Sequence, residues 1–325
     1  MLLRLAIVLL ASSPALGIAQ RQGASRPRPA ALRTPPPTLV SSPLATSAAA
    51  FGAANALGFG ISAATGWHYH LDLLGTGVFA VAALATKGVT RAQGLSAGAV
   101  ALWAGKLASF LFYRALINKN DGRLDETLST TSGQVGFWTI SFLWGYLVSL
   151  PHTLAATVPI AERPAFGAIH IGGLILFALG LAVESAADWQ KWTFKLDKGN
   201  AGKFCNVGVW RLSQHPNWLG NLILWTGIFI LNAPTLLAIG PAARIGKLVV
   251  PAWLGAGCRL ALGAVSPLFL FALFNGQATG VPPLNKGFEM TLARFGSDPA
   301  WQAYDAKTPK LLPTIRSLGH FLSGE

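Results

Sequence analysis

Long apolar stretches recur along the chain, and short polar segments separate them. A membrane helix needs about 20 predominantly apolar residues to cross the hydrocarbon core. The pattern predicts such helices at 44–64, 70–86, 95–117, 135–158, 165–184, 217–238 and 248–275. The sequence therefore predicts an all-α integral membrane protein with about seven transmembrane helices.

The composition agrees with a membrane environment. Apolar residues make up 52% of the 325 residues and charged residues only 11%, whereas a soluble domain carries roughly 25% charged residues. The two cysteines, Cys205 and Cys258, form neither a disulfide framework nor a metal-ligand spacing. We expect each of them to be a small apolar filler, and we expect no metal site.

The first 43 residues differ from the rest of the chain. "MLLRLAIVLLASSPALG" is typical of a signal peptide, and the Arg- and Pro-rich "QRQGASRPRPAALRTPPPTLVSSP" is typical of a transit segment or a disordered linker. We expect residues 1–43 to be a leader and linker that is cleaved before residue 44. Residues 44–325 would form one multi-pass membrane domain. We expect the membrane to be that of the endoplasmic reticulum or, given the two-part leader, of a plastid.

The net charge of +13 is unevenly distributed between the two ends of the predicted helices. With seven crossings, one side carries Lys119, Arg123, Lys191, Lys195, Lys198, Lys203, Arg211, Lys286, Arg294, Lys307, Lys310 and Arg316. The other side carries Lys87, Arg91, Arg163, Arg244 and Lys247. The positive-inside rule predicts that the first side faces the cytosol or its equivalent, and that the mature N-terminus faces the lumen. Because the basic residues flank membrane helices, we expect no nucleic-acid partner.

Several glycines and histidines imitate functional motifs. "GFGISA" and "GTGVFA" resemble a dinucleotide-binding motif, but that motif requires a preceding strand, so we interpret the glycines as helix-packing positions. We interpret "HYHLD" at 68–72 as a cap between two helices, because histidines two apart do not share a helix face. We expect His152 at a kink or cavity and His170 in a packed polar contact.

The segment "WRLSQHPNWLGN" at 210–221 places many polar side chains at the start of an apolar run. The first residues of this segment are the last residues of a predicted loop, 185–216. The five basic residues and the tryptophans of that loop could simply anchor lipid headgroups. Asp188 in this loop and Glu184 near a helix end argue against a pure lipid anchor, since ionisable groups at that depth need a partner. Pro216 predicts a helix start, with Ser213 or His215 as its cap.

"ADWQKWTFK", "GVWRLSQHPNWLGN" and "GVPP…RFGSDPAWQAYDAKTPKLLP", together with "LWAGKLASFLFYR" and "DGR", resemble the steroid 5-alpha-reductase-like membrane family. Within it, the chain is most similar to a large branch described as a domain of unknown function. The resemblance covers roughly 70–315 and is most specific at 180–315. It implies a membrane domain that holds NADPH in a cavity open to the cytosolic side, enclosed by the loop after the fifth helix, the His-Pro-Asn helix start and the C-terminal tail.

The resemblance and the chemistry of the side chains together predict a set of cofactor-binding residues. Cationic side chains and helix N-termini suit the pyrophosphate and the 2′-phosphate. Amides and carboxylates can form hydrogen bonds with ribose or amide groups, and tryptophans offer a flat apolar surface for a ring. The predicted residues are Glu184, Asp188, Lys195, Lys198, Trp210, Arg211, Ser213, His215, Asn217, Trp218, Asn221 and Tyr304. Gln214 stands where the family usually has Arg, and Asn221 where it usually has Glu.

The resulting hypothesis is an NADPH-dependent reductase that acts on a carbon–carbon double bond conjugated to a carbonyl in a lipid or steroid-like molecule. Tyr113 and His215 are the candidate catalytic residues, because either could stabilise the developing enolate. One alternative is an S-adenosylmethionine-dependent methyltransferase of the isoprenylcysteine or phospholipid type, which shares the His-Pro helix start. Another is a non-catalytic lipid-binding member of the family, suggested by Gln214 and Asn221. We expect no obligate protein partner.

Overall fold

The computed structural model describes residues 42–118, 125–240, 243–245, 248–276 and 282–323. The predicted leader, apart from its last two residues, and the predicted cleavage lie outside these ranges. The long helices of the described part are α2 (Pro43–Thr65), α3 (Leu71–Ala85), α4 (Arg91–Asn118), α6 (Thr131–Val148), α8 (Ala168–Leu196), α9 (Pro216–Leu236) and α10 (Ala252–Phe274). Five of them, α2, α4, α8, α9 and α10, are long and apolar enough to cross a membrane. The protein is therefore a multi-pass membrane protein built from helices.

The shorter elements connect these helices or follow them. They are α5 (Asp125–Leu128), α7 (Leu150–Thr157), η1 (Ile160–Glu162), η2 (Lys198–Asn200), η3 (Gly208–Arg211), α12 (Pro282–Phe295), α13 (Pro299–Lys307) and α14 (Ile315–Ser323). The strands β1 (Ala243–Ile245) and β2 (Leu248–Val250) form an antiparallel pair between α9 and α10. This short hairpin is the departure from the all-α expectation within the described residues.

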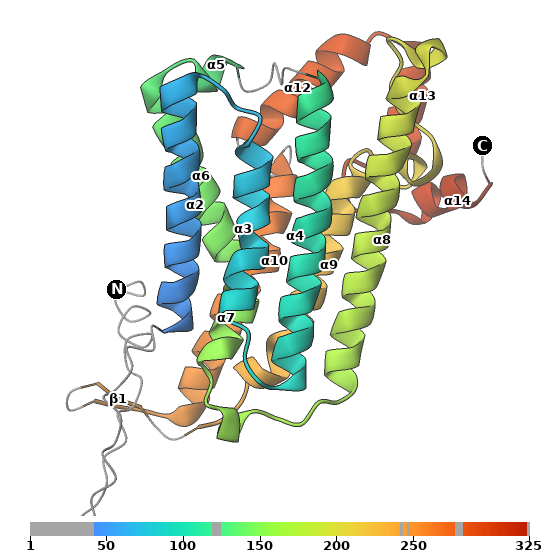
Figure 1. Cartoon of the computed structure of the whole chain (residues 1–325). Helices are drawn as coiled ribbons and strands as arrows, with labels where there is room; N and C mark the ends of the chain where they lie inside the picture. The colour runs from blue at the N-terminus through green and yellow to red at the C-terminus, as the bar shows by residue number, and fades with distance from the viewer. Residues whose placement is uncertain (1–41, 119–124, 241–242, 246–247, 277–281, 324–325) are drawn as a thin grey trace, which may run out of the picture.

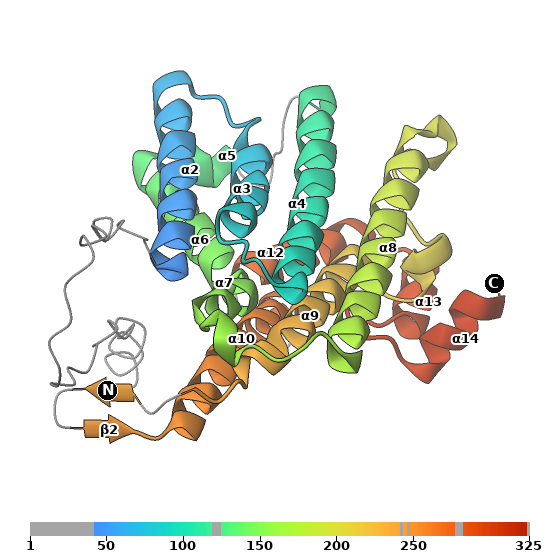
Figure 2. The same cartoon turned by 60° about the horizontal axis from the view of Figure 1, so that its bottom comes forward.

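The long helices stand side by side and run alternately up and down (Figure 1). In Figures 1 and 2, α2, α3, α4 and α8 form one row, and α6 with α7, α10 and α9 lie behind it. The connections after α2 and α8 lie at one end of the bundle, together with α12 and α13, and the hairpin lies at the other (Figure 1). Each predicted apolar segment thus has a helical counterpart, although α3 has only 15 residues.

Three predicted boundaries were wrong, one of them at residue 248, where strand β2 (Leu248–Val250) precedes the helix that was expected to begin there. The predicted helix 135–158 is interrupted at Ser149, where α6 ends and α7 begins. Pro151 explains the break, because it has no N–H for the helix and its ring crowds the preceding turn. The predicted loop 185–216 begins only at Asp197, because α8 continues to Leu196. Residues 185–196 contain no Gly or Pro, so charge in this stretch marked a polar helical face and not a loop.

Glycines set the closest contact in the bundle, which joins α8 to α9. A Cβ added to Gly180 would lie 2.4 Å from the backbone nitrogen of Leu224, and one added to Gly220 would lie 2.4 Å from that of Glu184. Gly173 and Gly227 make similarly close contacts one heptad away. Because the two backbones touch, polar side chains on neighbouring positions of α8 and α9 are forced into reach of each other.

Glycines in the first helices also receive large side chains, as predicted. A Cβ on Gly58, within "GFGISA", would lie 2.1 Å from the Trp138 indole of α6. The central core is aromatic, with Phe51, Phe79, Trp103 and Trp225 buried and their rings packed against one another. This core fills the space between α2 and α9.

The histidines outside the predicted site have the expected structural contacts. His68 Nδ1 lies 3.3 Å from Ser62 Oγ, and His70 Nε2 lies 2.9 Å from the Gly58 carbonyl oxygen, so "HYHLD" joins α3 to α2. His152 is buried beside Ser96 Oγ at 2.9 Å, directly after the break between α6 and α7. His170 accepts from its own helix start and stacks on Phe166.

Candidate functional site

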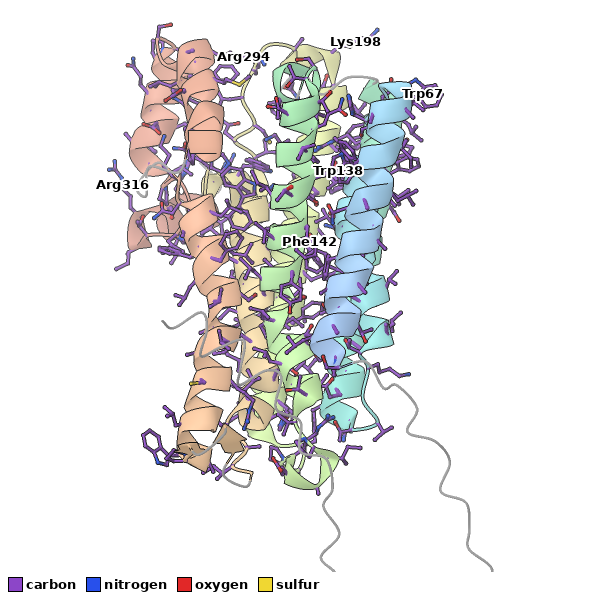
Figure 3. All side chains as sticks on the ribbon, turned by 90° about the vertical axis from the view of Figure 1, so that its left-hand side faces the viewer. Trp67, Trp138, Phe142, Lys198, Arg294 and Arg316 are labelled. Atoms are coloured by element: carbon purple, nitrogen blue, oxygen red, sulfur yellow. The ribbon has the colours of Figure 1, made fainter. Side chains whose placement is uncertain are left out.

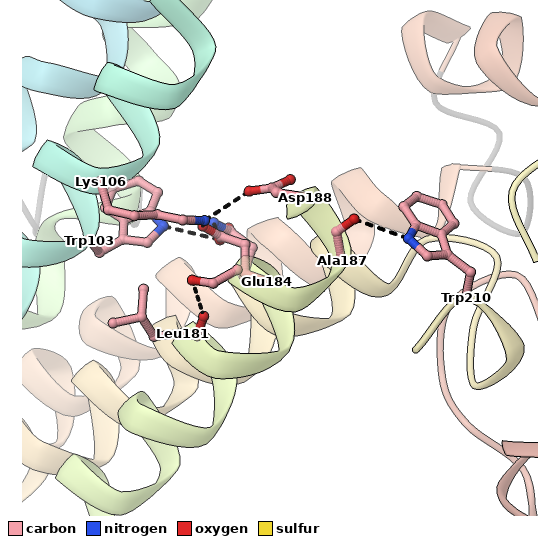
Figure 4. A network of polar contacts seen from close by, with 9 residues as sticks. Trp103, Lys106, Leu181, Glu184, Ala187, Asp188 and Trp210 are labelled. Atoms are coloured by element: carbon pink, nitrogen blue, oxygen red, sulfur yellow. Dashed lines mark hydrogen bonds and ion pairs between the residues drawn. The ribbon is translucent and has the colours of Figure 1, made fainter. Parts of the chain in front are cut away.

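A buried ion-pair network lies between α4, α8 and α9 (Figure 4). Glu184 and Asp188 are one turn apart on α8 and share a face. Lys106 of α4 reaches both: its Nζ lies 3.2 Å from Glu184 Oε1 and 2.8 Å from Asp188 Oδ2. The Glu184 side chain is only 3% exposed, so its charge has to be compensated inside the protein.

Two further donors complete the surroundings of Glu184. Trp103 Nε1 donates to its Oε2 at 3.1 Å, and Asn221 Nδ2 donates to the same oxygen at 2.8 Å. Asn221 is on α9 next to Gly220, so the glycine contact between α8 and α9 brings its amide to the carboxylate. The predicted residues Glu184, Asp188 and Asn221 therefore form one cluster.

Lys106 was not among the residues predicted from the sequence. The signal was present, because Lys106 lies in the middle of the apolar stretch 95–117, where an ionisable residue is expensive unless it is paired or functional. Trp103 was missed as well. Its indole lies one turn before Lys106 on the same face of α4.

Asn221 of this network and the neighbouring Trp225 each have a polar atom without a partner. Asn221 Oδ1 and Trp225 Nε1 are buried and make no hydrogen bond. The first is an acceptor and the second a donor, and the residues lie one turn apart on α9. Since buried polar atoms are normally paired, each of these two atoms has capacity for one further hydrogen bond.

The opposite side of α8 holds the segment 208–211 in place. Trp210 Nε1 donates to the Ala187 carbonyl at 3.0 Å (Figure 4), and Lys191 Nζ lies 4.4 Å from the centre of the Trp210 ring. Tyr304 of α13 donates from its hydroxyl to the Trp210 carbonyl at 2.5 Å. Burial raises the pKa of Tyr304 well above its ordinary value. The polar atoms of these two predicted residues therefore anchor the tail to α8.

Gln214 joins the tail to the His-Pro segment. Its Nε2 donates to Asp305 Oδ1 at 2.6 Å and to the Thr308 carbonyl at 2.8 Å, and its Oε1 accepts from Lys310 Nζ at 3.0 Å. Lys310 also pairs with Asp305. Burial raises the pKa of Asp305, but the hydrogen bonds from Lys310 and Gln214 outweigh it and bring the pKa below its ordinary value.

His215 sits in an electropositive environment at the start of α9. Its ring stacks on Trp218 at 4.1 Å, and Phe288 meets it edge-on at 4.9 Å. Burial lowers the pKa of His215 to about 3, and the charges of Lys191 and Lys310 contribute to the shift. The imidazole is therefore neutral at physiological pH, and the field around it favours an anion.

The predicted start of α9 is confirmed, but no side chain supplies the capping hydrogen bond. His215 occupies the N-cap position, but its side chain makes no capping hydrogen bond. Ser213 Oγ accepts instead from the backbone N–H of His215 at 3.1 Å and donates to the Lys310 carbonyl at 3.3 Å. Without a side-chain cap, the first turn of α9 keeps N–H groups for another acceptor.

The other predicted residues are spread around the end of the bundle where α8 ends and α9 begins. Asn217 is half-buried in the first turn of α9, and Arg211 donates from Nε to the Asn206 carbonyl at 3.2 Å. Lys195 and Lys198 are exposed near the end of α8. Tyr113 is 55% exposed and meets Trp192 edge-on at 6.0 Å, two turns beyond Lys106 on α4. The structure therefore does not bring Tyr113 into contact with His215.

Comparison with known proteins identifies the family. No curated protein and no solved structure matches the chain. A family model described as "Protein of unknown function (DUF1295)" matches residues 58–256, which is more than half of the chain and runs from α2 to the start of α10. The chain therefore belongs to the DUF1295 family of membrane proteins.

Proposed function

We propose that the protein is a membrane-embedded, NADPH-dependent oxidoreductase that reduces a conjugated carbon–carbon double bond of a lipid or steroid-like substrate. The observation that carries the proposal is the electropositive environment of His215, beside a helix start that has no side-chain cap. A dinucleotide with several phosphate charges suits this field. S-adenosylmethionine carries a sulfonium cation, which Lys191 and Lys310 would repel.

The residues present also fit the remaining parts of the cofactor. Lys191, Lys310 and the first turn of α9 would hold the pyrophosphate. Lys195 and Lys198 would meet the 2′-phosphate. The unpaired acceptor of Asn221 and the unpaired donor of Trp225 match a carboxamide, which has both an N–H and a carbonyl oxygen.

When bound, NADPH supplies a hydride to the β-carbon of the substrate. This chain's own residues would orient the two reactants and hold a donor at the carbonyl oxygen, where negative charge develops. His215, being neutral, can offer one N–H without giving up a proton. Tyr113 is the alternative donor, and its position between α4 and α8 suits a substrate that arrives from the membrane. The membrane would be that of the endoplasmic reticulum or a plastid.

The test is ligand binding to the purified full chain in detergent. NADPH, NADH and S-adenosylmethionine are titrated separately into the wild type and two variants. A hydrogen bond to a charged group contributes about 1.5–3 kcal/mol, so Asn217→Ala should weaken NADPH roughly 10- to 150-fold. Lys195→Ala should weaken NADPH more than NADH. Lys87→Ala, an exposed cation at the other end of the bundle, is the matched control and should change neither.

Two outcomes would reject the reductase proposal. Binding of S-adenosylmethionine without either nucleotide would favour the methyltransferase, to which the His-Pro start of α9 also corresponds. Binding of none of the three would favour a non-catalytic lipid-binding member.

A further inference from the structure

A groove opens on the outer face of the bundle between α2 and α6. Its volume is about 340 Å³, and Gly52, Asn55, Ala56, Phe59, Trp138 and Phe142 line most of it. Figure 3 faces this side of the molecule and labels Trp138 and Phe142 on it. In Figure 1, α2 and α8 stand at opposite sides of the bundle, so the groove is remote from the Glu184 network.

Small residues on α2 and aromatic residues on α6 create the groove. A Cβ added to Gly52 would meet only Phe142, at 3.9 Å, so the floor is open there. Gly58 lets the Trp138 indole lie directly on α2, and His70 stacks behind that indole at 5.7 Å. The walls are therefore held by packing without any ligand, as is usual for small-molecule sites.

Two polar atoms of the groove residues are buried and have no partner. They are Asn55 Oδ1, an acceptor, and Trp138 Nε1, a donor. Asn55 is 4% exposed and Trp138 is 3% exposed. Asn55 already uses its Nδ2 to donate to the Phe51 carbonyl at 2.8 Å, so its oxygen remains for another donor. Leaving one acceptor and one donor unpaired in an apolar site is unfavourable, and both atoms need an explanation.

We propose that this groove binds a membrane-soluble lipid alcohol. The apolar body would lie against Phe59 and Phe142, and the hydroxyl would donate to Asn55 Oδ1 and accept from Trp138 Nε1. A hydroxyl satisfies both atoms because it is a donor and an acceptor, whereas a ketone oxygen offers no donor for Asn55. None of the residues that line the groove is charged, which disfavours fatty acids and amines.

The proposed site is independent of the reductase proposal. The aromatic core formed by Phe51, Phe79 and Trp103 separates it from the Glu184 network. Binding can therefore be measured without any nucleotide. The outcome of that measurement does not depend on whether NADPH binds elsewhere.

The experiment compares an alcohol with its hydrocarbon. Tritiated farnesol is bound to the full chain in phosphatidylcholine nanodiscs and displaced by unlabelled farnesol or by farnesene, each expressed as a mole fraction of the lipid. The wild type should prefer farnesol to farnesene. Asn55→Leu and Trp138→Phe should each reduce this preference roughly 2- to 10-fold, which is the usual range for one hydrogen bond.

Three further variants make the result interpretable. Trp144→Phe changes a tryptophan of α6 that faces Phe79, outside the groove, and should keep the preference. Ala56→Trp and Gly52→Leu fill the groove and should abolish displaceable binding of both probes. Asn55→Leu removes an unpaired buried atom, so the melting temperature of this variant should not fall. An unchanged melting temperature shows that the variant has lost the site and not the fold.

The proposal is overturned if the wild type binds farnesol and farnesene equally, because the two polar atoms would then play no part. It is also overturned if both filling variants retain binding, since the probe would then sit elsewhere. The proposal is likewise overturned if the folded Asn55→Leu variant keeps the full wild-type preference for farnesol over farnesene.

Discussion

At the scale of single residues, Lys106 decides whether Glu184 can remain charged inside the bundle. The ammonium contacts Glu184 and Asp188, and its side chain is 26% exposed. Removing one partner of a buried pair leaves an uncompensated charge, which costs about 3 kcal/mol or more. Lys106→Met should therefore destabilise the protein by about 3 kcal/mol, measured by unfolding in detergent.

A double variant tests the cause of that loss. If the uncompensated carboxylate is responsible, adding Glu184→Gln to Lys106→Met should recover most of the stability. Lys87→Met, which removes an exposed cation between α3 and α4, should have little effect. Strictly additive losses in Lys106→Met and Glu184→Gln would show that the two side chains do not interact.

The low pKa of His215 predicts how stability depends on pH. The folded protein keeps this imidazole neutral down to about pH 3, while the unfolded chain takes up a proton near the ordinary value of 6.5. Protonation therefore favours the unfolded state as the pH falls below 6.5. Between pH 7 and pH 5 the native state should lose on the order of 2 kcal/mol through this group.

His215→Phe isolates this contribution from the other histidines, because it keeps an aromatic ring against Trp218. Wild type and variant are unfolded at several pH values, and the difference between the two curves is taken. The variant should lack the extra acid sensitivity. Parallel curves would mean that burial, together with the charges of Lys191 and Lys310, does not hold the pKa of His215 down in the folded protein.

Residue identity was predictable here, but pairing was not. The charge and apolar pattern of the sequence pointed to Glu184, Asp188 and the segment around His215. It could not show that Lys106 of α4 meets α8, because that contact joins residues 78 positions apart. Gln214 is a similar case: the family resemblance implies that an arginine has been lost there, whereas the folded tail brings Lys310 and Asp305 to its amide.

At the scale of elements, the contact between α8 and α9 depends on glycine. The Cβ of an alanine at position 180 would lie 2.4 Å from the Leu224 backbone, which cannot move aside as a flexible side chain could. Gly180→Ala should therefore separate the two helices and destabilise the protein by about 1–3 kcal/mol. The melting temperature in detergent measures this effect.

Gly172→Ala is the matched control in the same helix. A Cβ at that position would meet nothing within 4 Å, so alanine should be neutral or slightly stabilising. Because Gly220 lies beside Glu184 and precedes Asn221, Gly180→Ala should also disturb the Glu184 network and any ligand bound there. Equal melting temperatures for the two variants would show that the helices are not held by this contact.

Helix existence was easier to predict than helix ends. Apolar runs identified every long helix of the described part, because lipid-facing and core-facing positions are both apolar. The end of α8 was predicted too early. The helix continues beyond the apolar run through the polar stretch "DWQKW". The helix-packing role of Gly58 was predicted, but the closest approach of two helices uses Gly173, Gly180, Gly220 and Gly227, which the sequence did not single out.

At the scale of the whole molecule, the alternation of the helices determines which loops share a side. The segment after α8 and the helices of the tail lie at one end, and the connection between α3 and α4 lies at the other (Figure 1). Lys191, Lys195, Lys198, Lys203 and Arg211 all belong to the first end or approach it. The positive-inside rule therefore predicts that this end faces the cytosolic or equivalent side.

Cysteine accessibility in sealed vesicles can test this orientation. In a chain with Cys205 and Cys258 changed to alanine, single cysteines replace Lys198 and Val89, which are exposed at opposite ends of the bundle. In vesicles whose cytosolic face points outward, an impermeant maleimide should label Lys198→Cys at once. Val89→Cys should react only after the membrane is opened, because a charged, impermeant maleimide does not cross the hydrocarbon core. Immediate labelling of both positions would contradict an odd number of crossings between them, and the reverse pattern would invert the orientation that the lysines predict.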